Sequence, residues 1–384
     1  MAASAVKVNK KGALRLRRGH PWVFKSDVVS DAGAGAGPVT VVDERGQLLG
    51  TALHSPLSTI RLRLLSHERV NVNRALVLDR VSAALARRRL ALPAADAYRA
   101  VHGEADHLPG IFVDRYGDGV TVQSTCAGAD VLAPLVVDVL RELVSPRVIV
   151  VRNDAAARQH EKLRRYIEIA HGAPPTTVSY HEGALVLSTD LMADQKTGAY
   201  LDQSSNHVAA ARYARGESLD CFTYHGGFAL QLAAAGCSRV TAMDQSGEAL
   251  ARGRDNAERN RLAHIEWRQA NVFDALPQLF AAGARYDVIV LDPPAFASTA
   301  KTLDAAGRAY KEINLRAMKL LRPGGTLVSC SCSGRLAAAD FDAILADAAR
   351  DTRHSVQVLE RRGAGPDHPV LLGVPETEYL KCWI

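Results

Sequence analysis

The sequence feature that most constrains the fold is a regular alternation of strand-like and helix-like segments after residue 191. Short runs rich in apolar and β-branched residues occur at 218–222, 240–244, 265–269, 286–292, 326–331, 356–360 and 378–383. Segments with helical spacing lie between them at 228–235, 247–260, 303–321 and 337–350. This alternation is typical of a mostly parallel sheet covered by helices on both faces. We therefore predict an α/β domain with a seven-stranded, doubly wound sheet.

Three loops of this predicted domain carry the residues with useful chemistry. Each belongs to a segment in which a strand runs into a loop, and these segments are residues 219–228, 290–296 and 328–334. In an open α/β sheet such loops gather at the carboxyl ends of the strands, which is where ligands bind. The sequence therefore predicts one site built from all three loops.

The first loop indicates a nucleoside-containing ligand without a phosphate cradle. It has no GxGxxG spacing, which disfavours a nicotinamide cofactor, but Gly226 and Gly227 would let the backbone approach a ligand closely. Asp244 ends the next strand, where a carboxylate can accept hydrogen bonds from a ribose diol, and Asn271 can pair with an adenine edge. This order of features fits S-adenosylmethionine. The candidate cofactor-binding residues are Gln203, Asp220, Phe222, Tyr224, Gly226, Gly227, Asp244, Gln245, Asn271, Val272 and Asp292.

The other two loops predict chemistry on a pyrimidine base. In Asp292-Pro-Pro-Ala-Phe296 two prolines stiffen the turn, and Asp292 can hydrogen-bond N3 and the exocyclic amine of a cytosine. Enzymes that methylate amines commonly have an aromatic residue directly after the two prolines, whereas here Ala295 intervenes. Cys332 can add as a thiolate to carbon 6 of a pyrimidine and so make carbon 5 nucleophilic enough to take a methyl group. Asp292 and Cys332 are therefore the candidate catalytic residues.

Simpler interpretations of these residues stay open. Asp292 could cap a helix after its strand, and Cys330 and Cys332 could both be ordinary buried cysteines. In an extended strand the two thiols would share one face. Because Cys332 lies nearer the loop, it is the better candidate nucleophile, and Cys330 is the better core residue.

The N-terminal part of the chain is strongly basic. Residues 1–100 hold 17 Lys and Arg against 7 Asp and Glu, a local charge of +10, whereas the whole chain carries +6. This charge favours a module that binds a polyanion, although a merely solvated basic surface would look the same. The alternation at 12–19 and 59–65 predicts strands, with Arg61 and Arg63 on one face and apolar residues on the other. The candidate RNA-binding residues are Arg15, Arg17, Arg18, His20, Trp22, Lys25, Arg61 and Arg63.

The sequence predicts three domains. Residues 1–71 form a small β-barrel, residues 72–190 an α+β middle domain with a helix at 71–89 and a hairpin at 111–124, and residues 191–384 the doubly wound domain. No apolar run approaches the roughly 18 residues of a membrane span, and the six scattered cysteines do not suggest a disulfide framework. We expect a cytoplasmic protein without a metal site, in which His102 and His107 are loop residues. A homodimer stays open.

These motifs together resemble the large-subunit ribosomal RNA cytosine-C5 methyltransferases that carry an N-terminal PUA domain. The resemblance covers nearly the whole chain, from Gly19-His-Pro-Trp22 through Lys196-Thr-Gly-Ala-Tyr-Leu-Asp-Gln203 and Asp292-Pro-Pro-Ala-Phe296 to Ser331-Cys-Ser-Gly334 and Asp367-His-Pro369. It implies a Rossmann-like class I methyltransferase domain, S-adenosylmethionine as cofactor, large-subunit rRNA as partner and Cys332 as nucleophile. It also implies that residues 196–203 close over the cofactor.

We therefore expect an enzyme that methylates carbon 5 of a cytosine in large-subunit rRNA. Two other functions stay open. One is a guanine N-methyltransferase on the same scaffold, which would not need the cysteine. The other is an RNA-binding protein of ribosome assembly that has lost turnover. This last alternative rests on Ser204 and Asn271, which stand where the family usually has an arginine and an acid.

Overall fold

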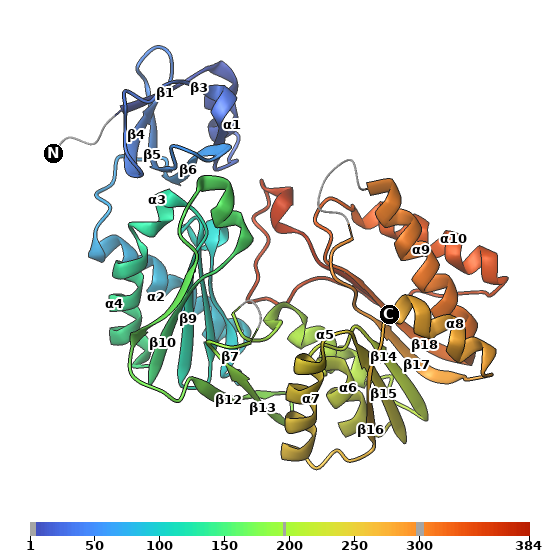
Figure 1. Cartoon of the computed structure of the whole chain (residues 1–384). Helices are drawn as coiled ribbons and strands as arrows, with labels where there is room; N and C mark the ends of the chain where they lie inside the picture. Colours follow the sequence, from blue (N-terminus) through green and yellow to red (C-terminus); the bar gives the residue numbers. More distant parts are fainter. Residues whose placement is uncertain (1–4, 195–196, 297–302) are drawn as a thin grey trace. The chain divides into compact units, whose positions relative to one another are not determined.

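The computed structural model describes residues 5–194, 197–296 and 303–384, and the chain forms two compact units (Figure 1). The first unit comprises Met1–Tyr180, Ser188–Ala199 and Pro366–Pro375. The second comprises His181–Leu187, Tyr200–Gly365 and Glu376–Ile384. Each unit is therefore built from segments that lie far apart in the sequence.

The first unit begins with a six-stranded sheet. Its strands are β1 (Ala5–Val8), β2 (Trp22–Phe24), β3 (Val28–Ser30), β4 (Gly37–Val42), β5 (Leu48–His54) and β6 (Ile60–Ser66), in the spatial order β2-β6-β5-β4-β1-β3. Strands β1 and β4 are parallel and the other neighbours are antiparallel. The core of this sheet consists of fully buried apolar residues such as Val6, Val8, Val23, Val41 and Leu62.

The predicted strand at residues 12–19 is wrong, because this segment is the helix α1 (Lys10–Arg17). Asn9 caps it, its side chain accepting a hydrogen bond from the Gly12 backbone N–H. The buried residues Gly12, Ala13 and Leu16 follow helical spacing. Over only eight residues, an alternating pattern fits one side of a helix as well as a strand. The Asn9 cap favours the helix.

The face of β6 that carries Arg61 and Arg63 is not an exposed face. Leu62 packs in the core of the six-stranded sheet, while Leu65 packs in the neighbouring core of the same unit. Both faces of the strand are therefore covered, and Arg61 is only 9% exposed. Alternation predicted which residues share a face but not that both faces are covered.

The next part of the first unit is a five-stranded sheet with helices α2 and α4 packed on it (Figure 1). Its strands are β7 (Ala97–His102), β8 (Ile111–Tyr116), β9 (Gly119–Ser124), β10 (Val148–Asn153) and β11 (Tyr166–His171), in the order β11-β10-β9-β8-β7. The helices are α2 (Arg74–Ala91), α3 (Ala127–Asp130) and α4 (Ala133–Val144). The predicted hairpin is confirmed, since β8 and β9 pair antiparallel.

His102 does not lie in a loop, as predicted, but ends β7, where it is 8% exposed. Burial lowers its pKa to about 2, and the positive charge of Arg99 acts in the same direction. His102 is therefore a neutral core residue. Within the described residues, no group of His, Cys, Asp and Glu side chains has the arrangement of a metal site.

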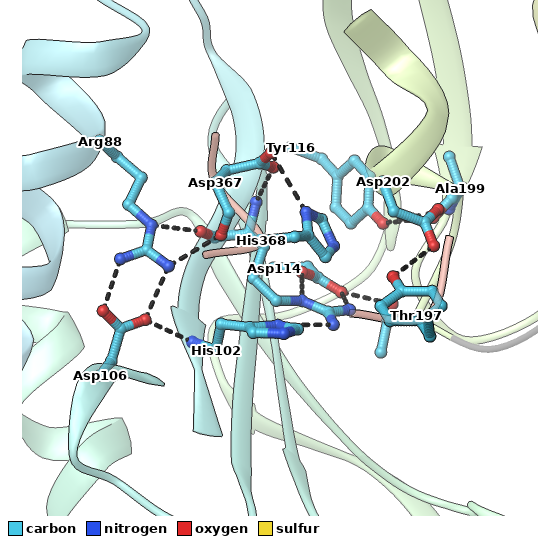
Figure 2. A network of polar contacts seen from close by, with 12 residues as sticks. Arg88, His102, Asp106, Asp114, Tyr116, Thr197, Ala199, Asp202, Asp367 and His368 are labelled. Atoms are coloured by element: carbon cyan, nitrogen blue, oxygen red, sulfur yellow. Dashed lines mark hydrogen bonds and ion pairs between the residues drawn. The ribbon is translucent and has the colours of Figure 1, made fainter. Parts of the chain in front are cut away.

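A network of buried charges ties distant segments of the first unit together (Figure 2). Arg88 on α2 donates two hydrogen bonds of 2.6 Å to the Asp106 carboxylate and one of 2.8 Å to the Asp367 carbonyl oxygen. Arg99 on β7 binds the Asp114 carboxylate twice, at 2.7 and 2.8 Å. Its backbone N–H also donates to the Asp367 carboxylate at 2.8 Å. The segment Pro366–Pro375 is thereby anchored to a helix and a strand that precede Asp367 by 279 and 268 residues.

The second unit is built around the predicted doubly wound sheet. Its strands are β14 (Glu217–Cys221), β15 (Arg239–Asp244), β16 (Ile265–Gln269), β17 (Tyr286–Leu291), β18 (Leu321–Ser331), β19 (Arg361–Arg362) and β20 (Lys381–Trp383), in the order β16-β15-β14-β17-β18-β20-β19. The first five are parallel, and β20 runs antiparallel to both β18 and β19. A hairpin of β12 (Thr177–Glu182) and β13 (Leu185–Asp190) precedes this sheet in the chain.

Helices cover both faces of this sheet, as predicted (Figure 1). They are α5 (Ser204–Ala211), α6 (Gly227–Ala234), α7 (Gly247–Arg259), α8 (Val272–Ala281), α9 (Leu303–Leu320) and α10 (Ala338–Thr352). Helices α6 and α7 pack on β14 to β16, while α9 packs on β17 and β18 with α8 and α10 beside it. None of the described helices is long and apolar enough to cross a membrane.

Two features of the second unit differ from the prediction. Residues 356–360 are not a strand, because Val356, Val358 and Leu359 are about half exposed and the segment has no buried face. The seventh strand is instead the short β19. Helices α5 and α8 were not predicted. Pro277 lies inside α8, and a proline in that position argues against a helix when only the sequence is considered.

Candidate active site

The candidate residues come together because four parallel strands end at the same edge of the second unit's sheet. The register pairs Cys221 of β14 with Met243 of β15 and with Leu291 of β17. Leu291 in turn pairs with Ser329 of β18. Asp220, Asp244, Asp292 and Cys332 therefore lie at or just beyond neighbouring strand ends, which is the arrangement that the sequence predicted.

Each of the two candidate catalytic residues is held by a short contact. The Cys332 Sγ lies 3.7 Å from the Pro293 carbonyl oxygen and donates to it. Asp292 accepts a 2.9 Å hydrogen bond from the Gln203 side-chain amide. The Gln203 oxygen accepts from Asn206 on α5 at 2.7 Å, so the amide is held in one orientation. A partly exposed thiol and a fixed carboxylate are thus neighbours.

Tyr200 is a residue of this site that sequence reasoning did not single out. Its hydroxyl is close enough to Asp292, Cys332, Asp202 and Asp244 to feel their charges. Burial raises its pKa to about 12, and the Asp292 carboxyl adds to the shift. Tyr200 is therefore a neutral hydroxyl group beside both catalytic candidates. The only sequence signal for it was its position in segment 196–203, of which Lys196 lies outside the described residues.

Asp220 is the most unusual acid of the site. Its Oδ2 accepts hydrogen bonds from the Thr223 hydroxyl and, at 2.9 Å, from the Ala229 backbone N–H. Its Oδ1 is fully buried and has no hydrogen-bond partner among the described residues. Burial raises the Asp220 pKa to about 7, and the charge of Asp292 acts in the same direction. A buried acceptor without a hydrogen-bond partner lowers the stability of the folded state. This oxygen is therefore suited to accept from a hydrogen-bond donor of a bound ligand.

The glycine pair has a packing role that the sequence did not predict. A Cβ atom on Gly226 would lie 2.5 Å from the Trp267 ring, and one on Gly227 would lie 2.3 Å from the His207 ring. Gly226 also has a φ of +83°, a conformation that glycine adopts without strain. Glycine is thus required at both positions by side chains of the protein itself.

The other candidate cofactor residues lie around the same edge of the sheet. Asp244 accepts from the backbone N–H groups of Tyr224 and Ser246, both at 2.9 Å. Tyr224 stands against Tyr200, with ring centres 4.8 Å apart. Gln245 is exposed, and the Phe222 ring contacts Phe273 of α8.

Asn271 and Val272 serve the start of α8. The Asn271 side-chain oxygen accepts from the Phe273 backbone N–H at 3.0 Å and so caps this helix. Val272 is 1% exposed and packs in the hydrophobic core. The predicted pairing of Asn271 with an adenine edge therefore competes with a cap, and Val272 has a core role.

Asp292 and Cys332 differ from a helix cap and from an ordinary buried cysteine, respectively. Residues 293–296, directly after Asp292, are not helical, so Asp292 is not a helix cap. Cys330 is fully buried and pairs across the sheet with Cys382, whereas Cys332 is partly exposed. The displaced aromatic residue Phe296 packs against Tyr310, with ring centres 4.7 Å apart.

The candidate RNA-binding residues differ in accessibility. Arg18 and Lys25 are exposed, whereas Arg15 and Arg17 form ion pairs of 2.7 Å with Asp27 and Asp43. The Trp22 indole donates to Glu104 at 2.8 Å, and its ring contacts His20. Arg61 is buried and Arg63 lies between Glu104 and Glu161. The last two are poorly placed to meet a polyanion.

Residues 153–377 match the family described as S-adenosylmethionine-dependent methyltransferase, and residues 6–67 match a PUA-like domain. The "Ribosomal RNA large subunit methyltransferase I" of Photobacterium profundum is 38% identical over 385 residues, covering 96% of each chain. The protein of the same name from Vibrio campbellii is 36% identical over 376 residues, covering 95% of each chain.

Two solved structures share the fold over the whole chain. A SAM-dependent methyltransferase from Streptococcus mutans has a TM-score of 0.84 at 19% identity, covering 100% of this chain and 99% of that chain. SMU.776, complexed with SAH, has a TM-score of 0.85 at 18% identity with the same coverage. The chain therefore belongs to the family of the ribosomal RNA large subunit methyltransferases I, S-adenosylmethionine-dependent methyltransferases with an N-terminal PUA-like domain.

Proposed function

We propose that this member of the family methylates carbon 5 of a cytosine in large-subunit ribosomal RNA through a covalent adduct with Cys332. The name of its relatives supports S-adenosylmethionine-dependent methylation of ribosomal RNA as the broader activity. The observation that carries the finer proposal is the 3.7 Å contact of the Cys332 Sγ with the Pro293 carbonyl oxygen. This contact holds the thiol against the loop that begins at Asp292.

The chemistry follows from the weak nucleophilicity of carbon 5. The Cys332 thiolate adds to carbon 6, and the electrons of the 5,6 double bond move to carbon 5. Carbon 5 then bonds to the methyl group that S-adenosylmethionine would supply: the bond from this methyl group to the positively charged sulfur breaks, and the sulfur keeps the electron pair and leaves as a neutral thioether. Loss of the carbon 5 proton to a base restores the double bond and expels the Cys332 thiolate. The base is thus methylated and the thiol is regenerated.

Asp292 orients the cytosine in this proposal. The Asp292 carboxylate accepts a hydrogen bond from the exocyclic amine of the base and can bind a protonated N3. The hydrogen bond from Gln203 fixes the carboxyl group for this role. Methylation of a guanine amine is less well supported, because Ala295 and not an aromatic residue directly follows the two prolines. The displaced Phe296 packs against Tyr310 and Phe273.

The residues at the ends of β14 and β15 are proposed to hold S-adenosylmethionine. The Asp220 Oδ1, which lacks a partner among the described residues, fits the positively charged amino group of the cofactor. Asp244 accepts one backbone hydrogen bond on each oxygen and has further lone pairs for a ribose diol. Tyr224 and Tyr200 line the same strand ends.

We expect the affinity for S-adenosylmethionine to rise with pH through neutrality. Burial raises the Asp220 pKa to about 7, and only the ionised carboxyl attracts a cation. The dissociation constant should therefore be about tenfold higher at pH 6 than at pH 8, as the ionised fraction changes. Asp220→Asn should weaken binding at pH 8 and remove this pH dependence. Isothermal titration calorimetry measures both, with the exposed Asp255→Asn as control.

The raised pKa of Asp220 affects folding stability in the opposite direction: affinity for the cofactor rises with pH, whereas stability without cofactor falls. Because the folded-state pKa of Asp220 lies above the usual value of an aspartate, the folded state holds the proton longer than the unfolded state. Stability without cofactor therefore falls as pH rises from about 4 to 7. At pH 8 Asp220→Asn should melt higher than wild type without cofactor and lower with it. A dissociation constant equal at pH 6 and pH 8 would contradict the role given to Asp220.

RNA binding is proposed to depend on the exposed basic residues near α1 and β2. Removing one side chain that binds a phosphate should make the logarithmic salt dependence of affinity shallower by about 0.7 to 0.9. Arg18→Ala with Lys25→Ala should therefore weaken binding to large-subunit rRNA and lower this slope by about 1.5. Filter binding at several salt concentrations measures the slope, with the exposed Arg350→Ala as control. An unchanged slope would remove these two residues from the interface.

The reaction itself is tested by the identity of the methylated nucleoside. Wild-type protein is incubated with labelled S-adenosylmethionine and deproteinised large-subunit rRNA or ribosomal particles, and the RNA is digested to nucleosides. The proposal predicts label in 5-methylcytidine. Label in a guanosine derivative would instead favour the guanine N-methyltransferase, and RNA binding without any label would favour an assembly protein.

A further inference from the structure

A buried lysine holds the loop that begins at Cys332. Lys381 lies on β20 opposite Ser331 of β18, and it is 4% exposed. Its Nζ donates to the carbonyl oxygens of Ser333 at 2.7 Å, Leu336 at 2.8 Å and Tyr379 at 2.9 Å. An ammonium group has three N–H donors, so all three are used. The chain after Cys332 therefore curls around one positive charge.

The same loop is held from a second direction by Tyr310 of α9. The Ser331 hydroxyl donates to the Tyr310 hydroxyl at 2.9 Å, and the Ser333 hydroxyl lies 3.0 Å from the same oxygen. The residues on both sides of Cys332 are thus bound to one buried side chain. Because the backbone is restrained by Tyr310 and Lys381 together, the direction of the Cys332 side chain is restricted.

Lys381 also lies close enough to Cys332 for their charges to interact. Burial lowers the Lys381 pKa to about 8, while Cys332 and the Glu378 carboxyl act to raise it. At pH 7 the amine is therefore about nine-tenths protonated. Lys381, Tyr200 and Tyr310 are titratable groups that feel the charge of Cys332, and of these three Lys381 carries a positive charge at neutral pH.

We propose that Lys381 is a positioning residue for Cys332: its ammonium group fixes the loop 333–336 and supplies the positive charge that favours the thiolate. The proposal rests on the role of Cys332 in the proposed function. A nearby cation favours the charged form of a thiol and so increases its reactivity. A neutral amine has only two N–H donors, so it would leave one of the three carbonyl groups facing a lone pair.

The test is the alkylation of Cys332 by iodoacetamide between pH 6 and pH 10, with the modified peptide quantified by mass spectrometry. The other five cysteines are buried and report on unfolding. In Lys381→Met the pH of half-maximal reactivity should rise by about one unit, and alkylation at pH 7 should slow about tenfold. Lys311→Met is the matched control, because Lys311 pairs with Asp347 and Asp351 on α10.

Methyl transfer by the same variants separates positioning from a merely structural role. Lys381→Met should lower kcat about tenfold or more with an unchanged KM for rRNA, as expected when the reactive thiolate is lost. The wild-type rate should fall above about pH 8 as Lys381 loses its proton. Lys381→Arg keeps its charge in this range and should not show that fall.

Each outcome has a separate meaning. An alkylation profile of folded Lys381→Met that superimposes on wild type overturns the inference. If Lys381→Met does not fold, Lys381→Arg decides, and a fall above pH 8 identical to that of wild type overturns the inference. If the alkylation profile shifts while Cys332→Ala still methylates RNA, Lys381 does tune Cys332 and the proposed nucleophile is wrong.

Discussion

Cys332→Ala should abolish methyl transfer to large-subunit rRNA, lowering the rate by at least about 10³-fold, because the covalent route has no substitute for the thiolate. The variant should bind S-adenosylmethionine and rRNA as wild type does, so the loss should appear in kcat. Single-turnover transfer of labelled methyl groups measures it. Cys330→Ala is the matched control, since Cys330 is fully buried opposite Cys382. Folded Cys330→Ala should keep a rate within about threefold of wild type.

The adduct itself can be captured with RNA that contains 5-fluorocytosine. After methylation, carbon 5 then carries fluorine where the proton would be, so the step that expels the thiolate is blocked. Wild-type protein should remain joined to the RNA on a denaturing gel, and Cys332→Ala should not. If Cys332→Ala retains most of its activity, the proposed chemistry is wrong and methylation at a nitrogen becomes the better explanation.

Arg88→Met should destabilise the first unit by about 3–5 kcal/mol, the usual cost of removing one partner of a buried ion pair. Arg88 is 2% exposed and Asp106 is 1% exposed, so the remaining carboxylate would lie buried without its main partner (Figure 2). The substitution also removes the hydrogen bond to the Asp367 carbonyl oxygen. Arg89→Met is the matched control, because Arg89 is the exposed neighbour on α2.

Hydrogen exchange of peptides from α2, β7 and the segment Pro366–Pro375 measures this destabilisation where it arises, and a thermal melt gives its size. The pH dependence provides a second readout. Burial alone would raise the Asp106 pKa, but hydrogen bonds from Arg88 and Arg87 outweigh it and lower the pKa. This stabilisation is therefore present above the unfolded pKa and is lost as pH falls through the lower folded value. The difference between wild type and Arg88→Met should shrink below about pH 4, and a constant difference would mean that the pair does not account for the stability.

Local patterns were enough to predict most of the second unit. The alternation of apolar strands with helical segments predicted the sheet, because a strand buried on both faces needs a continuous apolar run. The same reasoning failed at residues 356–360, where the apolar run is exposed. It also failed at residues 12–19, where an Asn cap and helical spacing outweighed an apparent alternation. Short segments fit both periods, so their surroundings decide between them.

The candidate site shows the same division. Asp220, Asp244, Asp292 and Cys332 could be found from the sequence, because each lies at or just beyond a strand end and strand ends gather at one edge. Tyr200 and Lys381 were not singled out, since a lone tyrosine or lysine has no distinctive spacing. Gly226 and Gly227 were predicted to let the backbone approach a ligand, and only packing shows that a side chain there would meet Trp267 or His207.

The sequence by itself determined most of the strands and helices of the second unit, apart from α5, α8 and β19, and the position of its reactive residues at strand ends. These properties depend on neighbours within a few residues, where periodicity and turn chemistry act. Only the tertiary structure decided that Gln203 holds Asp292, that Lys381 binds the loop after Cys332 and that Arg88 binds Asp367. Partners so distant in sequence are selected by burial, because a charged or polar group removed from water must find whichever partner the packed chain brings to it.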